Sequence, residues 1–281
     1  MQVDVGARSD IGRARTNNED CYCVLLEPNL FVVSDGMGGH AKGELASKLA
    51  VETVVKHFQE GEGNPAAPFF GEARADLCDR TNRLASAVDL ANSKICESAA
   101  KHPAQRGMGA TVVAALVRDH MLSIVHVGDS RAYLLRAGAL EQLTTDHSLV
   151  NEHLRLGLMT PQQAESSELQ NMLTRAVGAR EDLDIDAYEH LLLDGDSVLL
   201  CTDGLTRMVS HSEIAKTLVA TEDAQVAADR LVELANAHGG KDNVTVVVVR
   251  IRFCGALGRF YRWVRRSMRL PDEALSLERN R

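Results

Sequence analysis

Three short apolar segments, each ending in an aspartate beside a glycine, constrain this chain more than any other feature. They are LFVVSDG at 30–36, IVHVGDS at 124–130 and VLLCTDG at 198–204. Their length and their content of Val, Leu and Ile predict β-strands, and the glycines permit a sharp turn at each strand end. If the three strands lie together in the fold, Asp35, Asp129 and Asp203 meet at one edge.

The rest of the chain alternates blocks of strands with blocks of helices. Apolar runs predict further strands at 2–7, 20–26, 110–118, 131–136 and 243–252. Helical spacing of apolar residues predicts helices at about 42–59, 73–101, 211–220 and 223–237. The more polar segment 146–182 contains Thr160-Pro161, which suits a helix start, and we interpret it as a helical flap over a site. This order favours an α+β layered sandwich over a doubly wound parallel sheet.

Length and charge narrow the class of protein. The chain has 281 residues, which suits one large domain with a short appendage. The formal net charge is −8, but residues 252–281 hold eight Arg and three acids, so residues 1–251 carry −13. An acidic body argues against nucleic-acid binding, which needs Lys and Arg opposite phosphates, and suits a protein that gathers cations. The start of the chain lacks the pattern of a signal peptide and the six cysteines form no C-x-x-C pair, so we expect a cytoplasmic protein.

Further acids lie at the ends of other predicted strands. Glu19 and Asp20 open one strand, with Arg15 just upstream, and Asp242 precedes the last strand. Mg²⁺ and Mn²⁺ prefer oxygen ligands such as carboxylates, and the planar fork of arginine matches a phosphate. Each acid by itself is more often a turn residue. Acids at the edges of so many apolar strands together predict a cation site.

Eight strings follow one another along the chain in a set order. They are RTNNED, VVSDGMGGHAKGELAS, GMGATVVAAL, VHVGDSRAYLL, LTTDHSLV, LTRAVG, LLCTDGLTRMV and KDNVTVVVV. These strings resemble the motifs of the type 2C metal-dependent protein phosphatases, particularly the compact bacterial members. The resemblance extends from about residue 3 to residue 251.

The resemblance implies a fold and a metal centre. The fold is a four-layer α-β-β-α sandwich with two central antiparallel sheets, in a catalytic domain at 1–251 that includes the flap. A binuclear centre of two Mn²⁺ or Mg²⁺ ions would lie at one end of the sandwich. Its ligands would be Asp35, which bridges the ions, the carbonyl of Gly36, Asp203 and Asp242.

The resemblance also implies an activity, the hydrolysis of phosphoserine and phosphothreonine in proteins by a metal-activated water. Glu19 and Asp20 would hold metal-bound waters, and Arg15 would bind the substrate phosphate. The implied partners are phosphorylated proteins and a cognate serine/threonine kinase. We expect the protein to act as a monomer.

The chain departs from the family pattern close to these acids. Many members carry Asp four residues after the aspartate of the T-D-G motif, where this chain has Arg207. The resemblance implies that Asp129 helps to bind a third, weaker cation near Asp203. A guanidinium at position 207 should weaken or reorganise that site, so a purely structural role for Asp129 is equally open.

Two other observations concern histidines, and the first is a further departure from the family pattern. Many eukaryotic relatives have His directly after the first Asp-Gly, where this chain has Met37, and we interpret the nearby His40 as a surface or capping residue. In LTTDHSLV, the pair Asp146-His147 could be mistaken for a catalytic pair. We interpret Asp146 instead as the N-cap of the first helix of the flap.

The segment 252–281 forms a basic amphipathic tail in which apolar residues recur at helical spacing opposite arginines. From 252 to 269 there are six Arg and no acid. Three interpretations stay open: a helix docked on the acidic body, a segment that binds an acidic partner, and weak attachment to an anionic membrane surface.

Two other functions are compatible with the sequence. A catalytically silent protein of the same fold would bind phosphoproteins as a scaffold, and a metal-dependent phosphodiesterase or nuclease would also use acids and cations. The presence of Arg15, Asp35, Asp203 and Asp242 together favours the phosphatase over the scaffold. The acidic composition, without a basic and aromatic groove, counts against the nuclease.

Overall fold

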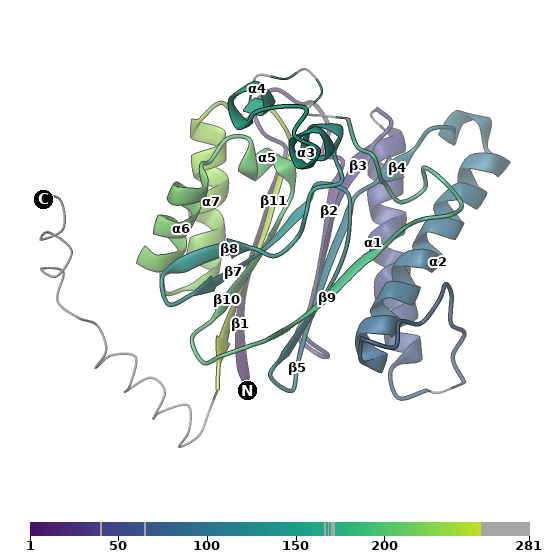
Figure 1. Cartoon of the computed structure of the whole chain (residues 1–281), viewed down its shortest axis with the longest axis horizontal. Helices are drawn as coiled ribbons and strands as arrows, with labels where there is room; N and C mark the ends of the chain where they lie inside the picture. The colour runs from purple at the N-terminus through teal and green to yellow at the C-terminus, as the bar shows by residue number, and fades with distance from the viewer. Residues whose placement is uncertain (40, 65, 166, 168, 170–171, 254–281) are drawn as a thin grey trace, which may run out of the picture.

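Two antiparallel β-sheets packed face to face form the centre of the fold, and helices cover both outer faces (Figure 1). The structure, a computed structural model, describes residues 1–39, 41–64, 66–165, 167, 169 and 172–253. One sheet has the strand order β1 (Gln2–Asp10), β11 (Val244–Arg252), β10 (Ser197–Cys201), β7 (Arg131–Arg136) and β8 (Ala139–Gln142). The other has the order β2 (Asp20–Leu25), β3 (Leu30–Met37), β5 (Val112–Arg118), β6 (Met121–Val127) and β9 (Asp186–Leu191), with β4 (Gly109–Ala110) paired to the end of β3.

Helices form the two outer layers. Figure 1 shows α1 (Ala41–Gly61) and α2 (Asp79–Lys101) against the sheet that contains β3, and α6 (His211–Ala220) and α7 (Ala224–Ala237) against the other sheet. Short helices complete the fold: the 3₁₀ helix η1 (Pro103–Gln105), α3 (Leu149–Arg155), α4 (Pro161–Glu165) and α5 (Asp203–Thr206). The predicted α+β sandwich of two antiparallel sheets between helical layers is therefore confirmed.

The central strands read as continuous apolar runs because both of their faces are buried. In β11, Val244, Val246 and Val248 pack toward α6 and α7, whereas Val247 and Val249 pack toward the opposite sheet. The same alternation holds in β3, where neighbouring residues face the α1–α2 layer and the other sheet in turn. Side chains alternate along a strand, so a strand buried on two sides needs apolar residues at every position.

Some elements differ from the prediction. The helix predicted to begin at residue 73 begins at Asp79, because the Asn82 side chain accepts the N–H of Arg74 at 2.7 Å and donates to the Leu77 carbonyl at 3.1 Å. These bonds fold the preceding segment into a loop. The strands β8 and β9 were not predicted, since both are edge strands whose mixed polarity lacks a clear apolar run.

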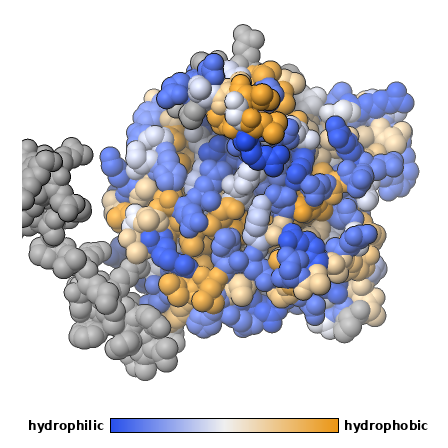
Figure 2. Space-filling view, in the orientation of Figure 1, coloured by the Kyte–Doolittle hydropathy of each residue, from blue (hydrophilic) through white to orange (hydrophobic). Residues whose placement is uncertain are grey.

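The flap lies over one end of the sandwich, at the top of Figure 1. Its first helix, α3, has Ser148 as N-cap, whose hydroxyl accepts the N–H of Asn151 at 3.3 Å. The prediction that Asp146 is the N-cap is therefore wrong. Leu156 and Leu158, just after α3, are exposed, and Figure 2 shows apolar surface in this part of the molecule.

The described helices are all too short or too polar to span a lipid bilayer. His40 and the tail from residue 254 onward lie outside the described residues, so the predictions for them stay predictions.

Candidate metal centre

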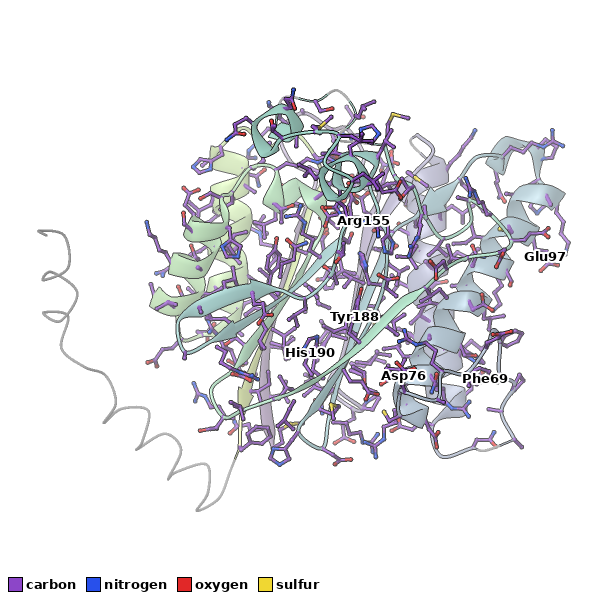
Figure 3. All side chains as sticks on the ribbon, in the orientation of Figure 1. Phe69, Asp76, Glu97, Arg155, Tyr188 and His190 are labelled. Atoms are coloured by element: carbon purple, nitrogen blue, oxygen red, sulfur yellow. The ribbon has the colours of Figure 1, made fainter. Side chains whose placement is uncertain are left out.

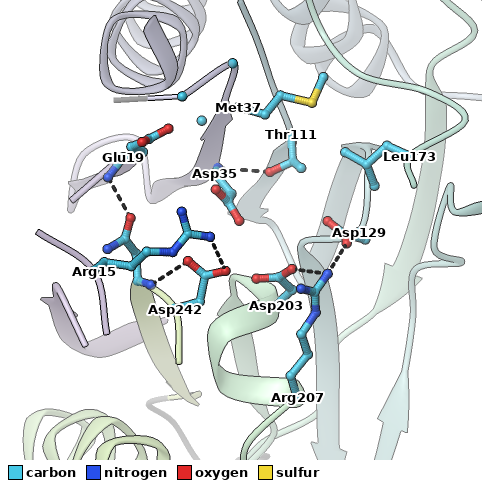
Figure 4. A pocket seen from close by; sticks show the side chains of 14 residues that line it. Arg15, Glu19, Asp35, Met37, Thr111, Asp129, Leu173, Asp203, Arg207 and Asp242 are labelled. Atoms are coloured by element: carbon cyan, nitrogen blue, oxygen red, sulfur yellow. Dashed lines mark hydrogen bonds and ion pairs between the residues drawn. The ribbon is translucent and has the colours of Figure 1, made fainter. Parts of the chain in front are cut away.

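A hollow of about 260 Å³ opens at the flap end of the sandwich, and acidic side chains dominate its wall (Figure 4). Its lining residues come from both sheets and the loops between their strands: Arg15, Glu19, Asp35, Gly36, Met37, Gly38, Gly39, Thr111, Asp129, Leu173, Asp203, Arg207, Asp242 and Asn243. Seven of the eight residues that the sequence singled out line this hollow. The eighth, Asp20, lies directly across β2 and β3 from Asp35 in the strand register.

The three apolar segments reach the hollow in a way that the sequence did not specify. Asp35 lies near the end of β3, and Asp129 follows β6 in the same sheet, with β5 between the two strands. Asp203 follows β10, which belongs to the other sheet. The face-to-face packing of the two sheets, rather than the pairing of neighbouring strands, brings these acids together.

Asp35 is held by a residue that the sequence analysis did not single out, Thr111. The Asp35 N–H donates to Thr111 Oγ1 at 2.9 Å, and the Thr111 N–H donates to the Asp35 carbonyl at 2.8 Å. Burial raises the pKa of Asp35 well above its usual value, and the neighbouring carboxylates of Asp20 and Asp203 raise it further. A crowd of buried carboxylates of this kind is costly unless cations compensate it.

Asp20 has one satisfied and one unsatisfied carboxylate oxygen. Its Oδ2 accepts from the hydroxyls of Thr245 at 2.7 Å and Thr202 at 2.9 Å. Its Oδ1 is buried and finds no hydrogen-bond donor within the described part of the chain, and the same holds for Oδ1 of Asp203. Burial raises the pKa of Asp20 to about 7, although the two threonine hydroxyls lower it.

Unsatisfied buried carboxylate oxygens around a hollow are what hard divalent cations require as ligands. The donor set contains only oxygen, which suits Mg²⁺ or Mn²⁺ better than a softer metal. The residues present therefore fit a centre for such cations.

Glycines allow Glu19 to reach the hollow. A Cβ added to Gly36 would collide with the carbonyl of Gly43, and one added to Gly43 would collide with the carboxylate of Glu19. The start of α1 can therefore approach the end of β3 closely. The Glu19 N–H donates to Asn243 Oδ1 at 2.8 Å, which fixes the segment before β2 against the start of β11.

Arg15 lies at the rim, where its Nη2 donates to Asp242 Oδ2 at 2.8 Å (Figure 4). Its side chain is about half exposed, so the guanidinium can turn toward a ligand in the hollow. An arginine beside a cation site is well suited to binding the oxygens of a phosphate.

Arg207 reaches into the hollow from the other side. Its Nη2 lies 2.5 Å from Asp203 Oδ2 and 3.5 Å from Asp129 Oδ2. Burial raises the pKa of Asp129 to about 7, Asp203 raises it as well, and the charge of Arg207 opposes both. A guanidinium thus sits between the two carboxylates that a third cation would need.

Asp146 and His147, from the LTTDHSLV string, lie beside the hollow and are not among its lining residues. Asp146 accepts from Arg131 Nε at 2.8 Å and from Arg131 Nη2 at 2.7 Å, a two-pronged ion pair that ties the start of the flap to β7. Met37 lines the hollow, as its place after Asp35-Gly36 requires.

Sequence reasoning missed the polar residues that orient the acids: Thr111, Thr202, Asn243 and Thr245. Each is a polar residue beside or inside an otherwise apolar strand, and each is buried. A hydroxyl or amide in that setting needs a partner, so this pattern was a signal available in the sequence.

Comparisons with known proteins agree on one family. A family model described as protein phosphatase 2C matches residues 12–236. Protein phosphatase PhpP of Streptococcus pneumoniae is 35% identical over 257 residues, which cover 88% of this chain and 97% of the relative. Serine/threonine phosphatase stp of Listeria monocytogenes is 35% identical over 245 residues, which cover 86% of this chain and 93% of the relative.

Solved structures are also similar. The Mycobacterium tuberculosis serine/threonine phosphatase PstP/Ppp superposes with a TM-score of 0.79 at 35% identity, over 89% of this chain and 99% of that one. A structure of the catalytic domain of PstP in complex with two manganese ions superposes with a TM-score of 0.75 at 35% identity, with the same coverage.

Proposed function

Because the chain belongs to the protein phosphatase 2C family and is a metal-dependent serine/threonine protein phosphatase, we propose that Asp35, Asp203 and Asp242 hold the two divalent cations on which its activity depends. The observation that carries this assignment is that three carboxylates, remote in sequence, line one hollow. The unsatisfied Oδ1 of Asp203, buried within the described residues, supports it. The substrates are phosphoproteins.

The charge of the centre supports two cations rather than three. Six carboxylates meet there, opposed by the guanidinium groups of Arg15 and Arg207, which leaves a formal charge of −4 when all are ionised. Two divalent cations balance that charge. Mn²⁺ or Mg²⁺ is the expected pair, as the all-oxygen donor set favours them.

Bound divalent cations lower the pKa of a water molecule toward neutrality and offset the negative charge of the phosphoryl oxygens. Asp35, whose charged neighbours are the other aspartates of the hollow, would help to hold both cations, and the Gly36 carbonyl would supply a further oxygen. Glu19, on the wall of the hollow, and Asp20, opposite Asp35 in the strand register, would hold metal-bound waters by accepting their hydrogen bonds. Arg15 binds the phosphoryl group of the substrate from the rim, which requires its release from Asp242.

Asp129 and Arg207 form a fixed pair in the place where a third cation would bind. Arg207 offsets one unit of the negative charge that Asp129 and Asp203 carry together, so a third cation is less needed at this place. Asp129 then acts by holding the guanidinium rather than by binding metal.

The activity is tested with p-nitrophenyl phosphate and a phosphothreonine peptide as substrates, first with Mn²⁺ and then with a chelator. Hydrolysis should need the metal, and Asp35→Asn should lower kcat by about 10²–10³-fold or more while the circular dichroism spectrum is unchanged. Asp76→Asn is the matched control, because Asp76 lies on the surface near α2 and pairs with Arg74 (Figure 3). Equal rates with and without chelator would contradict the metal assignment. Binding of the phosphopeptide without turnover by folded wild-type protein would favour the scaffold.

We further propose that the enzyme reverses the action of a serine/threonine kinase, since only a kinase supplies its substrates.

For the tail at 252–281, we propose peripheral attachment of a cytoplasmic protein to an acidic surface, such as an anionic membrane. The run of arginines without acids at 252–269 supports this proposal. We assign residues 1–251, with the flap at 146–182, to the catalytic domain.

A further inference from the structure

A buried set of hydrogen bonds joins the flap to the turn that carries Asp129, and none of the roles above uses it. At its centre is His147, which is only 5% exposed. Its ring Nδ1 accepts the N–H of Gly128 at 3.1 Å, and its own backbone N–H donates to the Gly128 carbonyl at 2.8 Å. His147 therefore holds both the N–H and the carbonyl of the residue before Asp129.

The opposite edge of the His147 ring faces β9. Because Nδ1 accepts a hydrogen bond, the neutral ring carries its proton on Nε2, which donates to Asp186 Oδ2 at 3.2 Å. Asp186 also accepts from the Tyr188 hydroxyl at 2.7 Å and from Arg175 Nη1 at 2.9 Å, and Figure 3 shows Tyr188 on β9. Burial raises the pKa of Asp186, but the hydrogen bonds from His147 and Tyr188 and the charge of Arg175 lower it overall. The carboxylate stays ionised and fixes the orientation of the ring.

The same histidine brings the two ends of the flap together. His147 lies at the start of the flap, and its carbonyl accepts the N–H of Thr174, near the end of the flap, at 2.9 Å. The next residue, Arg175, donates to Asp186. One residue, through its ring and its backbone, thus joins the beginning of the flap, the end of the flap and the Gly128–Asp129 turn.

The composition of this cluster could suggest a cation site, because one ligand atom each from His126, His147 and Asp186 lies within 4.8 Å of the others. The hydrogen bonds count against this interpretation. Nδ1 of His147 is occupied by the Gly128 N–H and its Nε2 carries the proton, so the ring has no lone pair left for a metal. The positive guanidinium of Arg175 lies 3.3 Å from the same Nε2. His126 packs against the His147 ring at a centroid distance of 4.6 Å.

The turn held by His147 is connected to the acids of the centre. Gly128 has a φ of 108°, and a Cβ there would collide with the side chain of Thr111. Ser130, on the other side of Asp129, shares a hydrogen bond of 2.7 Å with the Thr111 hydroxyl, which also accepts the N–H of Asp35. A shift of this turn would therefore disturb Asp35 through Thr111.

We propose that His147 is a positioning residue that couples the flap to the acidic centre by holding the Gly128–Asp129 peptide in place. The proposal rests on the phosphatase function described above. On this proposal, turnover depends on the hydrogen bond between His147 Nδ1 and the Gly128 N–H. The hydrogen bond from Nε2 to Asp186 sets the tautomer and the orientation of the ring.

Two substitutions separate the contribution of the Gly128 hydrogen bond from that of the Asp186 hydrogen bond. His147→Asn keeps an acceptor where Nδ1 lies, so kcat for p-nitrophenyl phosphate at saturating Mn²⁺ should stay within about 3-fold of wild type. His147→Gln keeps a donor toward Asp186 but loses that acceptor, and kcat should fall about 10–100-fold with KM little changed, as expected for a displacement of up to 1 Å in a catalytic group. Equal kcat values for Asn and Gln would overturn the proposal, because a merely structural histidine would not distinguish them.

The matched control is His57→Ala, which removes another buried histidine, on α1, whose ring packs edge-on against Phe70. It should lower the melting temperature without the loss of kcat seen for Gln. Long-range ¹H–¹⁵N correlation spectra of the wild-type imidazoles supply a readout that needs neither activity nor a folded variant. Protonated Nε2 and unprotonated Nδ1 in His147 are expected, and the reverse tautomer would overturn the proposal. Inactive but folded wild-type protein would instead count against the phosphatase function.

Discussion

Replacing Arg207 by aspartate should convert a centre for two cations into a centre for three. The wild-type acids and arginines leave a charge of −4, and Arg207→Asp removes one positive charge and adds one negative charge, which makes it −6. Three divalent cations balance that charge. The new carboxylate would lie beside Asp129 and Asp203, which together supply oxygens for the additional ion.

The structure gives the size of the effect on stability. The side chains of Asp203 and Asp129 are 11% and 10% exposed, so Arg207 is one partner of a nearly buried ion-pair group. Removal of one partner from such a group costs about 3–5 kcal/mol of unfolding free energy. The metal-free variant should lose about that amount. Binding of the third ion at 100 times its dissociation constant should restore about 2.7 kcal/mol.

The assay combines Mn²⁺ titration calorimetry with urea unfolding of metal-stripped and Mn²⁺-saturated protein. Wild type should bind two ions and Arg207→Asp three, while Arg207→Lys, which keeps the charge, should stay at two. Arg136→Asp is the matched control, because Arg136 pairs with the buried Asp196 at 2.7 Å outside the hollow. The Arg136→Asp variant should have a lower unfolding free energy than wild type, and Mn²⁺ should not specifically restore the difference. A third ion in the wild type, or an Arg207→Asp variant that binds only two, would refute this account.

Two further predictions concern pH and the tail. Burial raises the pKa of Asp20 and of Asp129 to about 7 in the folded metal-free protein, against about 4 in the unfolded chain. Between these two pH values the folded state binds more protons than the unfolded state. Its unfolding free energy should therefore fall as pH rises from about 4 to above 7. Urea midpoints of metal-stripped protein at pH 5 and pH 8 test this, and a midpoint that is equal or higher at pH 8 would contradict it. Deletion of residues 255–281 should abolish co-sedimentation with anionic liposomes at low salt, and unchanged sedimentation would end the membrane proposal.

Local patterns in the sequence were sufficient to select three acids of the hollow, Asp35, Asp129 and Asp203. An acid beside a glycine after an apolar run is visible in a single stretch, and the runs at 30–36, 124–130 and 198–204 all become strands that deliver an aspartate to the hollow. Helices with strong apolar spacing, such as that at 211–220, were also predicted with the observed ends. These features depend on neighbours a few residues apart, so the sequence alone determines them.

The predictions failed where the deciding partner is distant in sequence or where burial is one-sided. Asp146 resembles an N-cap locally, but the two-pronged bond from Arg131 on β7 takes up its carboxylate, and Ser148 caps the helix instead. β9 escaped prediction because an edge strand needs apolar residues on only part of its surface.

Tertiary structure alone determines which acids line the same hollow. Asp35 and Asp203 come from strands of different sheets, and no local pattern records how two sheets pack. The same is true of Arg207 between Asp129 and Asp203, and of His147, whose two ring nitrogens bond residues from separate strands or turns. Sequence fixes the chemical identity and local conformation of each group, but the free energy of a charge depends on which other charges surround it. That depends on packing between segments that are remote along the chain.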